Sequence, residues 1–194
     1  MARLRRPLIT LSVTWFVFSF VCSSSARDDR HPRGVLGWAR VLNQAAVQKE
    51  LKLSAEQLKV VEGASDLLDR IRDGKAQSIA EKQLTQSLTA QQLTRLKQIH
   101  WQRLGGEVLY EREVSLALMI TVEQKKQLAA ARAINVAEHK KMLNFLARAR
   151  FASKQALEAY KNKYRVAANK RLIAVLTPEQ KKTLDQLLGM RFDL

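Results

Sequence analysis

The sequence of 194 residues is poor in glycine, proline, cysteine and aromatic residues. It contains seven glycines, three prolines and one cysteine, and Phe, Trp and Tyr make up 6% of the chain. So little glycine and proline, beside abundant Ala, Leu, Gln, Lys and Arg, favours helices and argues against a β-sandwich. Because 46% of the residues are hydrophobic, the chain can form a sizeable core, and its length suits one domain or two small ones.

The one cysteine, Cys22, belongs to an N-terminal segment with the layout of a signal peptide. Three arginines in MARLRRP precede the uncharged run LITLSVTWFVFSFVC, and the SSSA that follows predicts cleavage after Ala26. That run has 15 residues, fewer than the roughly 20 of a spanning helix, so an uncleaved anchor is the weaker alternative. We therefore expect a periplasmic or otherwise exported protein with a signal peptide (1–26), a polar leader (27–34) and an all-helical domain (35–194). With no cysteine after residue 26, disulfides, zinc–thiolate sites and cysteine nucleophiles are excluded there.

Patterns that indicate catalysis or metal binding are lacking as well. The sequence contains no phosphate-binding glycine loop, no nucleophile elbow and no HExxH pattern. Its three histidines lie too far apart in sequence to indicate a zinc site: His31, His100 and His139. Four acidic residues recur at helical steps and indicate a solvated helix face or, alternatively, a divalent-ion or partner site: Glu62, Asp66, Asp69 and Asp73. We therefore expect no enzymatic activity, no metal and no cofactor.

The sequence does contain one short phrase in four copies: an aliphatic residue, Ser or Thr, two variable residues and Gln. The copies are LSAEQ (53–57), LTAQQ (88–92), ITVEQ (120–124) and LTPEQ (176–180). In such a capping box the hydroxyl accepts a hydrogen bond from the backbone N–H three residues later, and the Gln side chain accepts one from the N–H of the capping residue. Each phrase therefore predicts a helix start, worth about 1 kcal/mol per cap. The predicted capping residues are Ser54, Gln57, Thr89, Gln92, Thr121, Gln124, Thr177 and Gln180.

The spacing of the phrases predicts a two-fold repeat. VQKELKLSAEQ, from Val47, aligns without gaps with VSLALMITVEQ, from Val114, at an offset of 67 residues. The second and fourth phrases each open a helix that a glycine closes, Gly105 or Gly189. We expect repeat halves at about 35–106 and 107–194, in an all-α fold of antiparallel helical hairpins. Helices are expected over 35–52, 55–73, 76–86 and from 89, over part of 107–118, over 122–150, and again from a cap at Ser153.

Positive charge gathers in the second half of the chain. Residues 27–120 carry 15 basic and 12 acidic residues, whereas residues 121–194 carry 16 and 6, a net charge of +10. Such a field attracts acidic protein segments, anionic lipid or other polyanions, and nucleic acid is a poor match for an exported protein. Apolar residues near Phe145 and Leu146 lie in the same long basic helical hairpin. The predicted partner-binding residues are Lys140, Lys141, Arg148, Arg150, Phe151, Lys154, Tyr160, Lys161, Lys163, Tyr164, Arg165, Lys170 and Arg171.

The four phrases, in an exported, cysteine-poor, basic and helical chain, resemble the periplasmic LTxxQ-motif family, which includes the Spy and CpxP stress proteins and the zinc-resistance-associated proteins. The resemblance covers 53–57, 88–92, 120–124 and 176–180 and the overall character of the chain. It implies helical hairpins that pair into a curved, cradle-like dimer. It also implies chaperone activity without ATP or, for CpxP-like members, attenuation of an envelope stress sensor. Members of the family typically carry two copies of the motif, whereas this chain has four.

We therefore predict an exported, ATP-independent protein-binding protein that is chaperone-like or modulates an envelope stress sensor. Its partners would be unfolded or acidic proteins or a sensor domain, and a homodimer stays open. The alternative is a binding module for an anionic membrane or envelope polymer, without chaperone activity.

Overall fold

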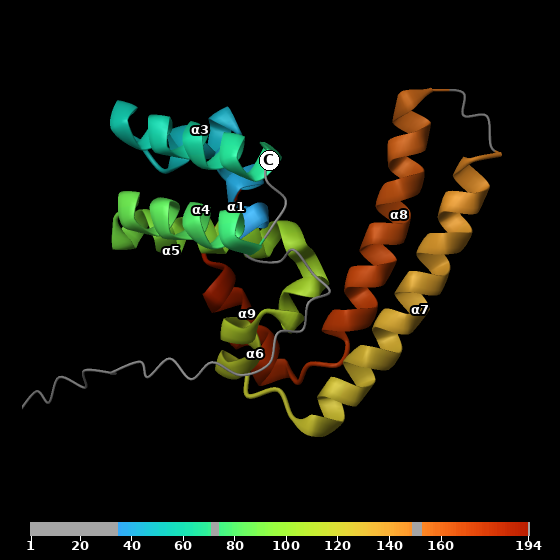
Figure 1. Cartoon of the computed structure of the whole chain (residues 1–194). Coiled ribbons are helices and arrows are strands. Elements are labelled where there is room, and N and C mark those ends of the chain that lie inside the picture. The colour runs from blue at the N-terminus through green and yellow to red at the C-terminus, as the bar shows by residue number, and fades with distance from the viewer. Residues whose placement is uncertain (1–34, 71–73, 149–152, 194) are drawn as a thin grey trace, which may run out of the picture. The chain divides into compact units, whose positions relative to one another are not determined.

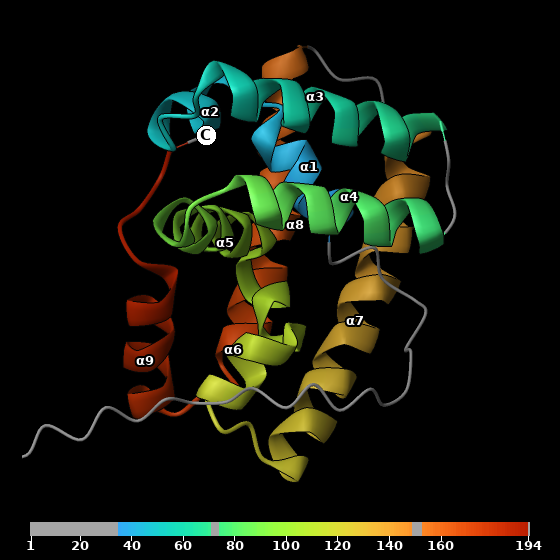
Figure 2. The same cartoon turned by 60° about the vertical axis from the view of Figure 1, so that its left-hand side comes forward.

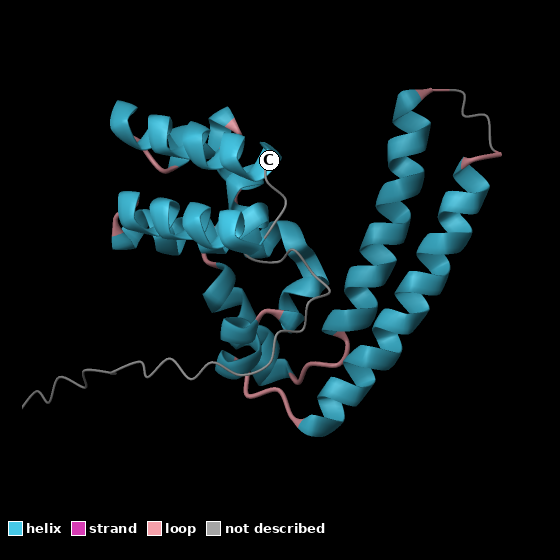
Figure 3. Cartoon of the chain, viewed as in Figure 1, coloured by secondary structure: helices cyan, strands magenta, loops and turns pink. Residues whose placement is uncertain are grey.

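The structure is a computed structural model that describes residues 35–70, 74–148 and 153–193. Every regular element in these ranges is a helix (Figure 3), so the expected all-α fold is confirmed. The described residues all belong to one compact unit. The signal peptide and the polar leader, expected over 1–34, lie outside the described residues.

The first half of the described chain forms α1 (Val35–Leu42), α2 (Ala45–Glu50), α3 (Ala55–Arg70), α4 (Gly74–Ser87) and α5 (Ala90–Leu104) (Figure 1). The single helix predicted over 35–52 is wrong, because the chain turns at Asn43 and Gln44. The turn allows Leu42 of α1 and Val47 of α2 to be fully buried in one core. Gln48 stabilises it by donating its side-chain amide to the Leu42 carbonyl oxygen at 2.9 Å.

The second half forms the 3-10 helix η1 (Gly105–Tyr110), then α6 (Arg112–Ala117), α7 (Val122–Leu146), α8 (Lys154–Ile173) and α9 (Pro178–Leu188). Ser153 caps α8, where its hydroxyl oxygen accepts a hydrogen bond from the Ala156 N–H at 3.1 Å. Gly105 ends α5 and Gly189 ends α9, with left-handed φ values of +56° and +64°. These glycines lie where the sequence predicted helix ends, since a residue without Cβ adopts this conformation at little cost.

Two clusters of buried apolar side chains hold the helices together. The first joins α1 to α5 and includes the fully buried Val47, Leu84 and Leu96. The second joins η1, α6, α9 and the ends of α7 and α8 that lie beside them, around Val108, Leu128 and Leu172. Helix α5 takes part in both clusters, because its later residues Trp101 and Leu104 pack against the second.

The four repeated phrases open α3, α5, α7 and α9, and each forms a capping box. The Ser or Thr oxygen accepts a hydrogen bond from the N–H of the Gln three residues later, at 3.1–3.3 Å. The Gln oxygen accepts one from the N–H of the capping residue, at 2.9–3.1 Å. The phrase therefore works locally as an N-terminal helix cap.

The phrases also meet in two pairs, a feature that the sequence did not predict. The side-chain amides of Gln57 and Gln92 exchange two hydrogen bonds, of 2.8 and 3.2 Å. Those of Gln124 and Gln180 exchange two, of 2.6 and 3.1 Å. We call these pairs the first and the second glutamine clasp. Each clasp joins the starts of two helices, α3 with α5 and α7 with α9.

Each clasp glutamine also donates to a backbone carbonyl just before its partner's phrase. In the first clasp these are the Ser87 and Leu51 oxygens, at 2.7 and 3.0 Å. In the second clasp they are the Val175 and Leu118 oxygens, at 3.1 and 2.9 Å. The accepting residue lies one or two positions before the phrase in every case, so the two clasps have the same arrangement.

The turns before the first and third phrases have matching backbones as well. Lys52 and Met119, which are 67 positions apart, have left-handed φ values of +50° and +52°. The residue after each donates to a carbonyl five positions back, Leu53 to Gln48 and Ile120 to Ser115, both at 3.1 Å. The two turns are therefore 67 residues apart, the same offset as the two aligned sequence segments. The duplication of whole halves stays a prediction.

Candidate partner-binding surface on α7 and α8

Helices α7 and α8 lie side by side and run antiparallel (Figures 1 and 2). Near α6, Asn135 of α7 donates to the Ala168 carbonyl of α8 at 3.3 Å. Arg171 of α8 donates to the side-chain oxygen of Asn135 and to Glu138, the latter at 3.0 Å. At the other end of the pair, the Phe145 ring lies 5.0 Å from the Tyr160 ring, centroid to centroid. Polar contacts at one end and aromatic contacts at the other therefore set the register of the two helices.

The aromatic end is only partly enclosed. Tyr160 and Tyr164 have their ring centroids 5.2 Å apart and their hydroxyl oxygens 3.2 Å apart. The hydrogen bond with Tyr164 raises the pKa of Tyr160 above its ordinary value, and loss of solvation adds to the effect. Both tyrosines are half-buried, whereas Phe145 is 48% exposed. This end of the helix pair thus presents the exposed Phe145 ring beside two half-buried tyrosines whose hydroxyls are hydrogen-bonded to each other.

Large apolar side chains remain exposed along both helices. On α7 they are Val122, Ile134, Val136, Leu143 and Phe145, and on α8 Val166, with exposed fractions between 48% and 72%. Residues at a spacing of 7 or 11 share a helix face, so Val136 and Leu143 form one row and Ile134 and Phe145 another. Helix α7 therefore shows apolar residues on two flanks, beside the face that packs against α8.

The predicted cations divide into engaged and available groups. Lys161 pairs with Glu158 at 2.9 Å, and Arg171 pairs with Glu138 at 3.0 Å. These are the two acidic residues between positions 138 and 173. Arg165 donates to the neutral side chain of Asn162 at 2.9 Å. Of the predicted cations, those that are exposed and have no ion-pair partner among the described residues are Lys140, Lys141, Arg148, Lys154, Lys163, Arg165 and Lys170.

One predicted binding residue lies between the two helices and not on an open surface, and two others lie outside the described residues. Arg171 is half-buried and holds α7 to α8, a positioning role. Arg150 and Phe151 fall within 149–152, outside the described residues. Sequence reasoning missed Ile134, Val136, Leu143 and Val166. A signal was present, because the apolar residues of 122–146 do not form the single stripe of an ordinary amphipathic helix.

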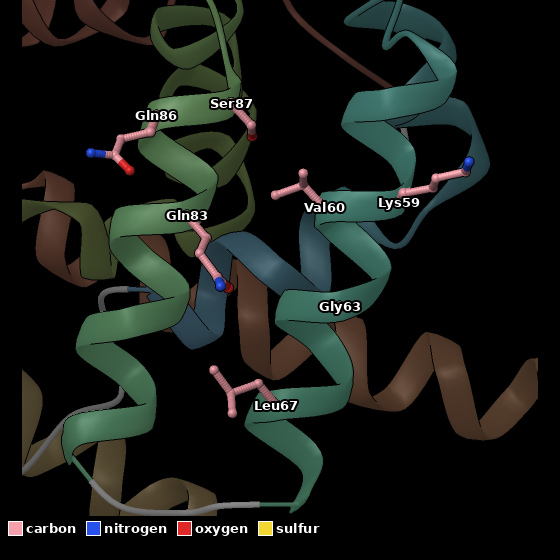
Figure 4. Close-up of a pocket in the computed structure, with 7 residues that line it drawn as sticks. All are labelled: Lys59, Val60, Gly63, Leu67, Gln83, Gln86 and Ser87. Carbon is pink, nitrogen blue, oxygen red and sulfur yellow. The ribbon is translucent and has the colours of Figure 1, made fainter.

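A groove of about 610 Å³ lies between α3 and α4. Figure 4 shows Val60 and Leu67 pointing from α3 toward α4, and Gln83 pointing from α4 toward α3. Gly63 leaves open space in α3, since a Cβ added there would meet nothing within 4 Å. Among the described residues of the lining, Lys59 alone is titratable, and its side chain points away from α4 in Figure 4. This groove offers methyl and amide contacts and no constellation for acid–base chemistry.

Within the described ranges, no group of three or more His, Cys, Asp and Glu side chains could hold a metal ion. In the same part of the chain, no helix is long and apolar enough to cross a membrane.

Fold and surface define the chain as an all-α protein with a basic, partly apolar two-helix surface. No protein-family model, curated protein or solved structure matches it.

Proposed function

We propose that this chain is an exported, ATP-independent protein-binding protein, either chaperone-like or a modulator of an envelope stress sensor, and that α7 and α8 carry the binding surface. The supporting observation is the combination of half-exposed apolar side chains with cations that have no ion-pair partner among the described residues. Burial of apolar area is worth about 25 cal/mol per Å². In the isolated chain the exposed rows on α7 are in water and do not contribute this stabilisation. A partner that covers them would bury the same apolar area, and that burial would stabilise the complex.

Charge and apolar surface have separate tasks in this mechanism. The cations act first, because an uncompensated positive field attracts acidic or partly unfolded chains over a Debye length of about 8 Å at physiological salt. The rows Val136/Leu143 and Ile134/Phe145 then hold the bound chain through contacts that need no particular sequence. Two open rows without a deep pocket favour weak, broad binding, which suits a client that must be released without ATP.

The repeated phrase supports the same proposal indirectly. Its glutamines form the hydrogen bonds of the capping boxes and clasps, so we assign the phrase a structural role and assign partner binding to α7 and α8. The resemblance to the periplasmic LTxxQ-motif family points to the same class of function. Four copies in one chain set it apart from the usual two, so the family's cradle-like dimer is not needed for this proposal.

The test is light scattering from an aggregating, unfolded client protein, with and without this protein, at low and high salt. Two double variants separate the two tasks. Val136→Ser with Leu143→Ser removes an apolar row, and Lys140→Gln with Lys141→Gln removes two cations that form no ion pair with any described residue. A matched control is Ile79→Ser on α4, which removes an apolar residue 50% exposed on another part of the chain.

We expect the unmodified protein and the Ile79→Ser control to suppress aggregation, more strongly at low salt. The apolar double variant should lose suppression at both salt concentrations, and the lysine double variant should lose mainly the low-salt advantage. Suppression by the apolar double variant equal to that of the control would contradict the role of α7. If no form suppresses aggregation and the protein binds anionic vesicles instead, the membrane-binding alternative replaces the proposal.

A further inference from the structure

A second concave surface lies between α5, α8 and the chain that follows α9. It encloses a cavity of about 1080 Å³, and its walls include three arginines from three segments: Arg103 of α5, Arg165 of α8 and Arg191 after α9. Val166, Leu188 and Phe192 add apolar contacts to the lining. We call this cavity the arginine basin.

The α8 wall of the basin is fastened to the end of α5. The Gly106 N–H donates to the side-chain oxygen of Asn169 at 3.0 Å. The approach is so close that a Cβ on Gly105 would lie 2.5 Å from the Asn169 amide nitrogen. Arg165 lies one helical turn before Asn169 and on the same side of α8, and Arg103 lies two residues before Gly105. Both arginines therefore project from backbone that this contact holds in place.

Two residues of α5, Gln102 and Arg95, fasten the opposite wall. Gln102 donates its amide to the Leu188 and Met190 carbonyls, at 2.7 and 2.9 Å. Its oxygen accepts a hydrogen bond from the Phe192 N–H at 2.8 Å, and Phe192 packs against the first core. Arg95 adds a hydrogen bond to the Met190 carbonyl at 2.7 Å. The segment after α9 is thus bound to α5 at several points, and the basin exists before any ligand arrives.

The charge of the lining is not balanced by carboxylates. Arg191 pairs with Asp193 at 3.2 Å, both well exposed. Arg165 has a neutral hydrogen-bond partner, and Arg103 has no ion-pair partner among the described residues. Among the described lining residues, the remaining acid is Asp185. Two arginines therefore face the basin with one carboxylate, and guanidinium groups bind carboxylates through paired, charge-assisted hydrogen bonds.

We propose that the arginine basin binds an extended, acidic segment of a partner protein, with carboxylates at Arg103 and Arg165 and an aliphatic side chain against Val166. Val166 is 57% exposed, so it offers apolar area beside the charges. The cavity lies at the upper limit of the roughly 300–1,000 Å³ typical of small-molecule pockets, and its charged and apolar walls suit the mixed side chains of a peptide segment. The inference rests on the proposed function, because it names the chemistry of the partner and adds a binding site apart from the exposed rows of α7.

The test uses the full-length protein and a labelled peptide of alternating Asp and Leu, with an Asn-for-Asp peptide as the uncharged probe, by fluorescence anisotropy at low salt. Arg103→Gln and Arg165→Gln should each weaken binding of the acidic peptide by about tenfold, the loss expected for one charge-assisted contact. Asp185→Asn should tighten it by about two- to threefold, because it removes a repulsive charge from the basin. Arg112→Gln, an exposed arginine on α6, is the charge-matched control and should change the dissociation constant by less than about twofold.

Opposite effects of the Arg165 and Asp185 variants support the basin, because misfolding cannot tighten binding. Equal binding of the acidic and Asn peptides, equal losses in the Arg103 and Arg112 variants, or no binding of the acidic peptide would each overturn the inference. The result of the aggregation assay is independent of the peptide-binding result, since its variants lie on α7 and not in the basin. Arginine-dependent peptide binding without suppression of aggregation would retain the basin and reject the proposed function.

Discussion

Replacement of Gln124 and Gln180 by alanine, singly and together, measures how strongly the second glutamine clasp couples the starts of α7 and α9. The oxygen of Gln124 accepts from Thr121 N–H and from Gln180, at 3.1 Å each. Its amide nitrogen donates to the Val175 carbonyl at 3.1 Å and to Gln180 at 2.6 Å. Gln180 has the same four kinds of bond, so two bonds are shared between the glutamines and two belong to each alone.

The size of the effect follows from this division. A hydrogen bond contributes about 1 kcal/mol net to folding, and removal of an N-cap interaction costs about the same. Each single alanine variant loses four bonds, but the clasp is only partly buried and water can replace some of them. We therefore expect each single variant to lose about 2–4 kcal/mol of unfolding free energy. The double variant should lose about 1–2 kcal/mol less than the sum, because the two shared bonds are counted once.

Urea unfolding followed by far-ultraviolet circular dichroism measures these free energies, provided that the denaturant slope is the same in all variants. The matched control is the cross pair Gln57→Ala with Gln180→Ala, which takes one glutamine from each clasp. Its effects should add within about 0.5 kcal/mol. A second control is Gln127→Ala on the exposed face of α7, which should change stability by less than about 0.5 kcal/mol.

The reasoning is refuted if the coupling energy of Gln124 and Gln180 is no larger than that of the cross pair. In that case each phrase would be an independent helix cap, and the exchanged amide bonds would contribute nothing measurable to folding.

Three further predictions concern particular backbone and side-chain positions. Gly105→Ala should cost about 1–3 kcal/mol, because φ there is +56° and the new Cβ meets the Asn169 amide, whereas Gly63→Ala in α3 should gain about 0.5–1 kcal/mol. Urea unfolding checks both, and a loss of stability in Gly63→Ala would contradict the open space at that site. Tyr160 should ionise above its ordinary pKa of 10.0 and move toward it in Tyr164→Phe, as followed by tyrosinate absorbance. Since folding favours the neutral phenol, this contribution to stability is present below pH 10 and is lost as pH rises through the raised pKa. If the pKa of Tyr160 in Tyr164→Phe stays as high as in the unmodified protein, the hydrogen bond is not its cause.

Helix starts and ends could be read from the sequence because their causes are local. Thr121 and Gln124 lie within one helical turn, and the capping bonds need no other part of the chain. Gly105 and Gly189 mark helix ends because the left-handed conformation favours a residue without Cβ. The positive φ values at Lys52 and Met119 went unpredicted, since neither is a residue type that favours positive φ.

The break between α1 and α2 could not be read because neither glycine nor proline stands at Asn43 or Gln44. The helical pattern continues through both positions, and the chain turns because Leu42 and Val47 then share a core with α5. Burial in tertiary structure outweighs helix propensity, which differs by less than about 1 kcal/mol among ordinary residues.

On the candidate surface, too, local features could be read from the sequence and contacts between distant residues could not. The sequence indicated that the basic residues of 140–171 lie on long helices, since charge and periodicity are properties of a single segment. It could not tell Arg171, which is held by Glu138 across the helix pair, from Lys163, which has no ion-pair partner in the described part of the chain. The availability of a cation depends on a contact between residues 33 positions apart.

The sequence by itself therefore determined that the chain is all-α, that four phrases cap helices, and that its second half is basic, because each of these depends on neighbours within a few residues. Tertiary structure alone decided that Gln57 meets Gln92 and Gln124 meets Gln180, across 35 and 56 residues. It also decided which apolar residues of α7 stay in water, and that Arg103 and Arg165 line one basin. These features depend on which distant segments pack together, and a local sequence pattern does not determine that.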